Sequence, residues 1–257
     1  MPISISTAML YPRPLAECLR LADQAGVEAV ELMPQDPAEC DPGLADITAA
    51  HRGRARITSI HFPLILEPFL GNPYPGARRF ARTLLDGLLA LADRLECRFI
   101  VVHPARPGDP PIFTEPFEEN LAYLGERARV RDVKVGLENT VSSPTSSPQG
   151  HAEMLAAHAH LGVVPVVDTT HARLCGYDPL DFLRLIPAPH LHLSDHLNGE
   201  RHLHLGSGDI DWPKVLAAAR PDATLVIEVG YKHCWEDPAA ALAANVGYLR
   251  RALEGAA

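Results

Sequence analysis

Short apolar runs alternate with longer amphipathic stretches along the whole chain. Runs such as FIVVH (99–103) and LVIEV (225–229) are mostly apolar, which is typical of strands buried on both faces of a parallel sheet. Other runs end in a polar residue, so the apolar pattern also marks where each strand stops. We predict strands at Ile3–Thr7, Glu28–Met33, Ile57–His61, Phe99–His103, Val133–Glu138, Val163–Asp168, His190–Leu193 and Leu225–Glu228.

Between these runs, apolar residues recur three and four positions apart, which is the period of an amphipathic helix. The clearest case carries Leu84, Leu85, Leu88 and Leu91 on one face, whereas the periodicity after the second strand is weaker. The predicted helices are Pro14–Gln24, Asp36–His51, Ala77–Leu95, Phe117–Val130, His151–His160, Leu180–Leu185, Trp212–Ala219 and Ala239–Leu253.

Strict alternation of eight strands with helices predicts an α/β fold, a single (β/α)8 TIM barrel that spans residues 1–257 as one domain. An open, doubly wound sheet is the alternative. It is disfavoured because neither G-x-G-x-x-G nor G-x-x-x-x-G-K occurs, and no linker marks a second domain. The longest irregular stretch, Phe62–Gly76, follows the third strand, and we expect it to form a lid or a pocket wall.

Composition narrows the classes of function. The net charge is −9, with 32 acidic and 23 basic residues, which makes nucleic acid an unlikely partner because phosphate contacts need clustered Lys and Arg. Five cysteines without a C-x-x-C spacing indicate neither a disulfide framework nor a thiolate zinc site. The N-terminus lacks a signal-peptide pattern, and no apolar stretch approaches the ~18 residues of a membrane span. We expect a cytoplasmic protein without a membrane partner; the sequence leaves open whether it forms a homo-oligomer.

Nine residues that can bind metal ions lie at or just after the predicted ends of the third to eighth strands. In a TIM barrel these ends meet at one mouth, where the active site lies. A single such residue is usually a loop cap, but nine at consecutive strand ends favour a metal centre. Four are carboxylates, which would repel one another unless cations or protons neutralised them. Their donor atoms suit Zn²⁺, Mn²⁺, Co²⁺ or Mg²⁺. The nine are His61, His103, Glu138, Asp168, His171, His192, Glu200, His202 and Glu228.

The other histidines have different expected positions. His190 lies two residues before His192, so it is expected on the same inward face, deeper in the barrel. Those in predicted helices, such as His151, are expected to be solvated or at an interface. His196, His204 and His233 are expected in loops near the mouth, in contact with the substrate or in structural roles.

Three segments resemble the xylose isomerase-like barrel superfamily, which includes sugar (phosphate) isomerases and epimerases and the endonuclease IV type of DNA-repair enzyme. They are GLENT (136–140), VVDTTHARLCGYDPL (166–180) and HLSDHLNGERHLHLGSGDIDW (192–212). The beginning of the chain, residues 3–34, resembles the isomerase/epimerase branch in particular. The resemblance covers nearly the whole chain.

The resemblance implies a set of ligands and roles. The core metal ligands of the isomerase branch fall on Glu138, Asp168, His192 and Glu228, and in its ketose epimerases the two glutamates are also the catalytic acid/base pair. Endonuclease IV adds further ligands to this core. The whole set would hold one to three divalent ions. The added ligands fall on His61, His103, His171 and His202, with Glu200 where that family carries Asp.

Two enzymatic functions follow from these residues. The first is a metal-dependent isomerase or epimerase that moves a proton next to a carbonyl of a small sugar, sugar phosphate or polyol, with Arg201 or His204 holding a terminal oxygen. The alternative is an endonuclease IV-like phosphodiesterase acting on abasic DNA. The chain lacks the Arg- and aromatic-bearing loop after the second strand, and it has Leu64 where an aromatic residue would insert. A non-catalytic metal-binding protein is the third possibility; the presence of both glutamates argues against it.

Overall fold

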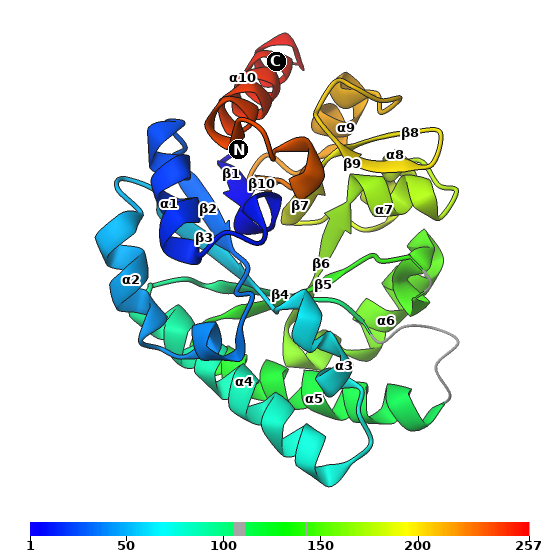
Figure 1. Cartoon of the computed structure of the whole chain (residues 1–257). Helices are drawn as coiled ribbons and strands as arrows, with labels where there is room; N and C mark the ends of the chain where they lie inside the picture. Colours follow the sequence, from blue (N-terminus) through cyan, green and yellow to red (C-terminus); the bar gives the residue numbers. More distant parts are fainter. Residues whose placement is uncertain (105–110, 142, 257) are drawn as a thin grey trace.

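Eight parallel strands close into a barrel in the computed structural model, which describes residues 1–104, 111–141 and 143–256 (Figure 1). Their order around the barrel is β1-β10-β7-β6-β5-β4-β3-β2, so the last strand pairs with the first. This confirms the predicted TIM barrel and excludes the open sheet. The strands are β1 (Ile3–Ser6), β2 (Ala29–Leu32), β3 (Arg56–His61), β4 (Phe99–Val102), β5 (Lys134–Glu138), β6 (Val163–Asp168), β7 (His190–Leu193) and β10 (Thr224–Ile227).

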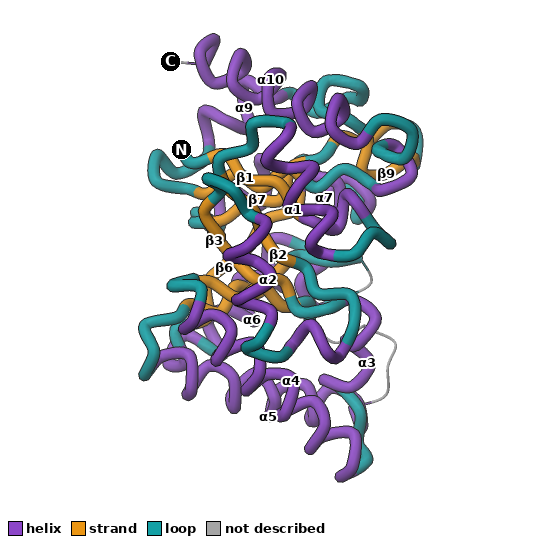
Figure 2. The backbone as a smooth tube through the Cα atoms, turned by 60° about the vertical axis from the view of Figure 1, so that its left-hand side comes forward, coloured by secondary structure: helices purple, strands orange, loops and turns teal. Residues whose placement is uncertain are grey.

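Helices enclose the strands on the outside, as two views show (Figures 1 and 2). All the predicted helices are present with shifted ends, although one begins at Pro111 rather than Phe117 and Asp36–His51 is split at Asp41–Gly43. Among the described residues, none of the helices has the length and apolarity needed to cross a membrane. They are α1 (Leu15–Gln24), α2 (Leu44–His51), α4 (Pro75–Arg94), α5 (Pro111–Arg129), α6 (Pro148–Ala157), α8 (Pro179–Leu185), α9 (Trp212–Ala218) and α10 (Pro238–Ala256).

Two short helices and a hairpin that the sequence did not predict follow the ends of barrel strands and therefore lie on the mouth side. The short helix α3 (Glu67–Leu70) lies inside the 62–76 stretch. The helix α7 (Thr169–Leu174) begins directly after β6, where the side chain of Asp168 caps it by accepting from the backbone of His171. The strands β8 (Asp195–Leu197) and β9 (Glu200–Leu203) form an antiparallel hairpin after β7.

The two faces of the barrel strands differ in polarity. Outward residues such as Ile5, Leu137 and Leu191 join one apolar core with the surrounding helices. Because side chains alternate along a strand, the residues between them point into the barrel. Those residues include an unusual number of buried polar groups: Ser4, Ser6, Glu31, Ser59, His61, Glu138, Asp168, His190 and His192. A polar interior of this kind requires partners for each group, and it supplies the chemistry of the mouth.

His151 on α6 is buried, which corrects the expectation that it is solvated or at an interface. Its Nε2 donates to the backbone oxygen of Leu137 at 2.9 Å, and its ring meets that of Phe182 edge to face. The donor tautomer leaves Nδ1 unprotonated, and Nδ1 has no hydrogen-bond partner among the described residues. Burial lowers the pKa of His151 to about 4, so the neutral ring is the form that the fold accommodates.

We predict that acid destabilises the fold through His151. Because the pKa of this group is lower in the folded than in the unfolded chain, the unfolded state binds more protons between pH 6.5 and 4, and stability falls as pH decreases through that window. The shift corresponds to a loss of about 3 kcal/mol at pH 4. Urea unfolding at pH 7 and pH 4 gives the decrease in the free energy of unfolding between the two pH values. This decrease should be smaller in His151→Gln than in the wild type by about 3 kcal/mol. Equal losses in the two proteins would contradict the prediction.

Candidate metal centre at the barrel mouth

Glu138 ends β5 at the centre of the mouth, where its carboxylate is buried among four imidazoles. Its Oε2 lies 3.4 Å from His61 Nε2, 3.2 Å from His103 Nε2 and 3.1 Å from His192 Nδ1. Its Oε1 lies 3.2 Å from His171 Nδ1. The four histidines come from β3, the residue after β4, α7 and β7, so one carboxylate joins the ends of five neighbouring strands.

Two further carboxylates complete the centre. Asp168 ends β6, and Glu228 follows β10 with its Oε2 2.8 Å from His192 Nδ1. Donor atoms of Glu138, Asp168, His192 and Glu228 all lie within 4.8 Å of one another, as do those of His61, His103 and Glu138. The mouth therefore contains two groups that could each hold a metal ion, and Glu138 belongs to both.

Two of the histidines have one ring nitrogen held by a backbone carbonyl. His61 Nδ1 donates to the oxygen of Phe62 at 2.7 Å, and His171 Nδ1 lies 3.0 Å from the oxygen of Asn139. A neutral imidazole that donates from one nitrogen has a lone pair on the other. Metal-binding histidines are usually fixed in this way, by a carbonyl or a carboxylate behind the ring.

The other two histidines around Glu138 each have a carboxylate beside one ring nitrogen. His103 Nδ1 lies 2.6 Å from Glu67 Oε1, and His192 Nε2 lies 3.3 Å from Glu31. Neither Glu31 nor Glu67 was singled out by the sequence analysis. Glu31 could have been found from its inward position in the apolar strand AVEL. Glu67 lies in the irregular 62–76 stretch, and its contact with His103 makes that stretch part of the wall of the mouth.

Several buried polar atoms of the centre lack a hydrogen-bond partner in the described part of the chain, and a divalent cation would fit them. Buried polar atoms normally have hydrogen-bond partners, yet Glu138 Oε1, Asp168 Oδ2 and His192 Nδ1 have none among the described residues. All three atoms belong to residues of the four-membered group. Carboxylate oxygens and imidazole nitrogens are ligands for Zn²⁺ and Mn²⁺, so a cation in this group would satisfy all three atoms.

The pKa values show where protons reside when no cation neutralises the carboxylates. Burial alone would raise the pKa of Glu138, but the imidazoles of His192 and His103 outweigh it and hold this pKa well below its ordinary value. Burial likewise would lower the pKa of His192, but Glu138 and Glu31 raise it well above the usual range. The pKa of Asp168 is raised, mainly by burial. At neutral pH the raised pKa values keep His103, His171 and His192 protonated.

Two of the predicted ligands, Glu200 and His202, lie outside both groups. Glu200 lies on β9 with an exposed side chain, 3.4 Å from Lys232 Nζ, and it belongs to neither group. His202, in the left-handed region at φ 52°, is half-buried, and its Nδ1 lies 3.1 Å from Ser194 Oγ. Its ring is 5.3 Å from that of His171, so these two predicted ligands are neighbours without Glu200.

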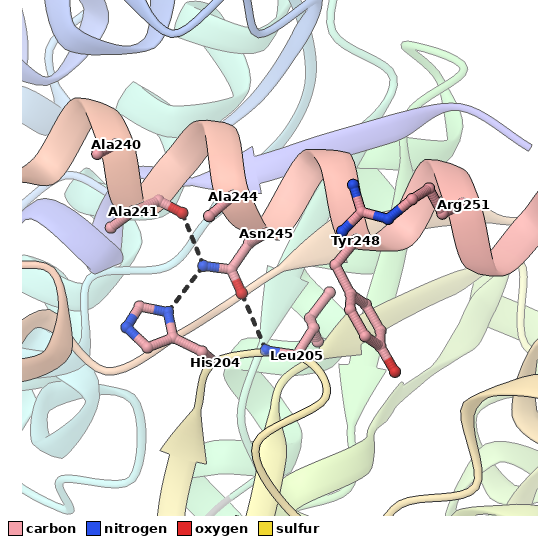
Figure 3. Close-up of a pocket in the computed structure, with 8 residues that line it drawn as sticks. All are labelled: His204, Leu205, Ala240, Ala241, Ala244, Asn245, Tyr248 and Arg251. Carbon is pink, nitrogen blue, oxygen red and sulfur yellow. Dashed lines mark hydrogen bonds between the residues drawn. The ribbon is translucent and has the colours of Figure 1, made fainter.

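The two predicted substrate contacts also lie outside the groups. Arg201 is exposed on β9. His204 lies in a surface pocket of about 380 Å³ beside α10, where its Nδ1 accepts from Asn245 Nδ2 at 2.8 Å (Figure 3). Its Nε2 donates to the backbone oxygen of His233 at 3.1 Å. Both ring nitrogens of His204 are thus engaged within the protein.

Comparison with known proteins agrees with the fold. Residues 19–252 match the family model described as xylose isomerase-like TIM barrel, so the chain belongs to this family. An uncharacterised protein of Mycobacterium leprae is 25% identical over 240 residues, which cover 80% of this chain and 79% of that protein.

Solved structures cover almost the whole chain. An L-ribulose 3-epimerase superposes with a TM-score of 0.78 at 18% identity, covering 100% of this chain and 96% of that one. A probable 3-DHS dehydratase from Bacillus anthracis has a TM-score of 0.76 at 15% identity, covering 97% and 99%. A Thermus thermophilus protein, solved after soaking with ZnCl₂, is 25% identical with a TM-score of 0.72, covering 99% of each chain. The fold is thus shared by an epimerase, a dehydratase and a zinc-soaked protein.

We predict that Zn²⁺ binding releases protons and that its affinity increases with pH between 6 and 9. Burial alone would lower the pKa of His171, but the negative charges of Asp168 and Glu138 outweigh it and raise this pKa to about 9. The pKa values of His103 and His192 are also raised. These protons must leave before the imidazoles can bind a cation. Calorimetric titrations in two buffers with different ionisation enthalpies should give different heats at pH 7. The same heat in both buffers would contradict the prediction.

Proposed function

We propose that the chain is a divalent-metal-dependent isomerase or epimerase that moves a proton next to a carbonyl of a small sugar, sugar phosphate or polyol. The observation that carries this proposal is the pair Glu138 and Glu228, whose carboxylates both contact His192 Nδ1, at 3.1 and 2.8 Å. An epimerase needs two acid/base groups close to one reacting carbon, and both glutamates lie in one four-membered group at the mouth. The fold shared with an L-ribulose 3-epimerase supports the same class.

In this mechanism the two glutamates divide the proton transfer. One ionised carboxylate removes the proton next to the carbonyl. In an isomerisation it returns that proton to the neighbouring carbon, whereas in an epimerisation the other glutamate, which must first take up a proton from solvent, delivers it to the opposite face. Burial raises the pKa of Glu228, but His192 outweighs it and lowers this pKa, so Glu228, like Glu138, is ionised and able to accept a proton at neutral pH. A bound divalent cation would supply Lewis-acid stabilisation of the negative charge that develops on the substrate.

The residues around the centre have supporting roles in the proposal. Asp168 and His192 complete the four-membered group, and His61 with His103 could hold a second ion beside it. Arg201 and His204 stay predictions as contacts for the far end of the substrate. Arg201 is the stronger candidate, because its exposed side chain is free to turn whereas His204 would first have to break its bonds with Asn245 and His233.

A second candidate function is metal-dependent phosphodiester hydrolysis of the endonuclease IV kind. The observation that favours it is the second group, His61, His103 and Glu138, which could hold a second ion, because two neighbouring ions would suit an in-line displacement at phosphorus. The exposed position of Glu200 and the net charge of −9 weigh against it. We therefore place it second.

We predict that Glu138→Gln and Glu228→Gln each lower turnover by at least ~10²-fold, the usual contribution of a general acid or base. Pools of ketoses, aldoses, polyols and their phosphates incubated in D₂O should reveal the substrate by deuterium incorporation at the carbon next to the carbonyl. Glu126→Gln, an exposed change on the outer helix α5, is the matched control. Metal content is measured in every variant, because loss of the ion would mimic loss of the acid/base group. Turnover close to wild type in either fully loaded variant would remove that glutamate from the mechanism.

A parallel assay distinguishes the two candidate functions. A duplex with an abasic site is offered to the zinc-loaded protein at physiological salt, where weak phosphate contacts are screened. We expect no cleavage. A metal-dependent nick that disappears with Glu138→Gln would reverse the order of the two functions.

A further inference from the structure

We propose that Glu31 is a positioning residue that holds the imidazole of His192 in one orientation and tautomer, and so controls how tightly the four-membered group binds a divalent cation. The inference deepens the proposed function and rests on its metal centre. It concerns a carboxylate that is not itself at the mouth but lies deeper in the barrel, on β2.

Glu31 is fully buried, and its contacts converge on β7. Its Oε2 accepts from Ser59 Oγ at 2.7 Å and lies 3.1 Å from His190 Nε2 and 3.3 Å from His192 Nε2. Its Oε1 is also 3.3 Å from His192 Nε2 and has no hydrogen-bond partner among the described residues. Both oxygens therefore face the same imidazole nitrogen, as a carboxylate does when it fixes the direction of a ring.

An irregularity in the sheet places Ser59 beside Glu31. Val30 pairs with Ile57 but Glu31 pairs with Ser59, so Thr58 is an extra residue in β3. A regular register would put Thr58 opposite Glu31; instead the hydroxyl of Thr58 lies 2.9 Å from Ser4 Oγ, and Ser59 takes the place opposite Glu31. Bulges are often found beside functional sites, where they redirect a side chain. Here the bulge gives the buried carboxylate a hydroxyl donor.

The opposite edge of the His192 ring faces the metal centre. Its Nδ1 lies 3.1 Å from Glu138 and 2.8 Å from Glu228. A carboxylate behind Nε2 keeps the proton on that nitrogen, so the Nδ1 lone pair is directed into the four-membered group. The negative charge of Glu31 also makes the imidazole a stronger donor to a cation.

Glu31, His190 and His192 also have donor atoms within 4.8 Å of one another and could themselves be considered as ligands. Three features favour the hydrogen-bonding role. A neutral imidazole has a single lone pair, so His192 cannot serve this group and the mouth together. Ser59 and the two rings already provide donors for Glu31. The ring of His190 is stacked on Phe99, with centroids 4.6 Å apart, which fixes it in place.

Zinc titration of Glu31→Gln against a competing chelator tests the role. Glutamine is nearly isosteric, but its amide can turn an N–H toward Nε2 and favour the tautomer whose Nδ1 is protonated. We expect one Zn²⁺ equivalent to bind 10- to 100-fold more weakly, the usual effect of losing such an outer partner, while any other equivalent keeps its affinity. Ser59→Ala is the control, because it removes a contact of the same carboxylate but leaves the charge behind His192. It should bind Zn²⁺ with an affinity close to wild type.

The protonation of His192 provides a readout that a merely structural role would not change. Nitrogen-15 NMR of the zinc-loaded wild type should show a proton on Nε2 of His192, and Glu31→Gln should reduce that population. If Glu31→Gln does not fold, Glu31→Asp, which keeps the charge on a shorter side chain, should show a smaller loss of affinity in the same titration.

Three outcomes would overturn the inference. Wild-type affinity in folded Glu31→Gln, or in folded Glu31→Asp if Glu31→Gln does not fold, would refute the role of Glu31 and leave the metal centre intact. A third equivalent in the wild type that vanishes with Glu31→Gln would make Glu31 a ligand instead. A wild type that binds no divalent ion at all would refute the proposed metal centre itself, which distinguishes that failure from the first two.

Discussion

The burial of the Glu138 carboxylate is the constraint on which the mouth of the barrel depends. Removing a carboxylate from water costs several kcal/mol unless charges or hydrogen bonds compensate for it. In this barrel the compensation comes from four histidines at the ends of neighbouring strands, at 3.1 to 3.4 Å. The ends of those strands must therefore meet around one point, which the closed barrel of parallel strands provides.

These histidines in turn have hydrogen-bonding partners on the ring edge that faces away from the centre, so an outer shell of polar groups surrounds the inner one. His103 and His192 have Glu67 and Glu31 behind them, whereas His61 lies against a backbone carbonyl. Such outer partners fix the direction of each lone pair before any cation arrives. The polar interior is thus continuous from Ser59 in the lower barrel to Glu228 at the mouth, while the apolar packing that stabilises the fold lies on the outer face of the strands.

Much of the fold could be predicted from the sequence because it depends on local periodicity and chain order. Apolar runs separated by amphipathic stretches indicated each barrel strand, and the common direction of parallel strands then brought Glu138, Asp168, His192 and Glu228 together. Seven of the nine predicted ligands lie in the two groups or, like His171, contact Glu138. Of the other two, His202 has its ring beside that of His171, whereas the exposed side chain of Glu200 lies outside both groups.

The rest depended on features that a strand pattern does not contain. The position of Glu200 is set by the β8–β9 hairpin, whose turn passes through Asn198 and Gly199 at positive φ. The role of Glu31 depends on a one-residue bulge in β3 and on contacts across the barrel, and neither leaves a periodic signal. His204 stays a predicted substrate contact; its hydrogen bond with Asn245 on α10, 41 positions away in the sequence, has no local signal either.

The central claim is that Glu138 belongs to a metal centre at the mouth, and anomalous diffraction tests it most directly. Crystals grown with Zn²⁺ or Mn²⁺ should give an anomalous peak within the group of Glu138, Asp168, His192 and Glu228. If the second group is also a site, a further peak should lie between His61, His103 and Glu138. Crystals at saturating metal without a peak in the four-membered group, or with peaks only elsewhere on the protein, would contradict the account.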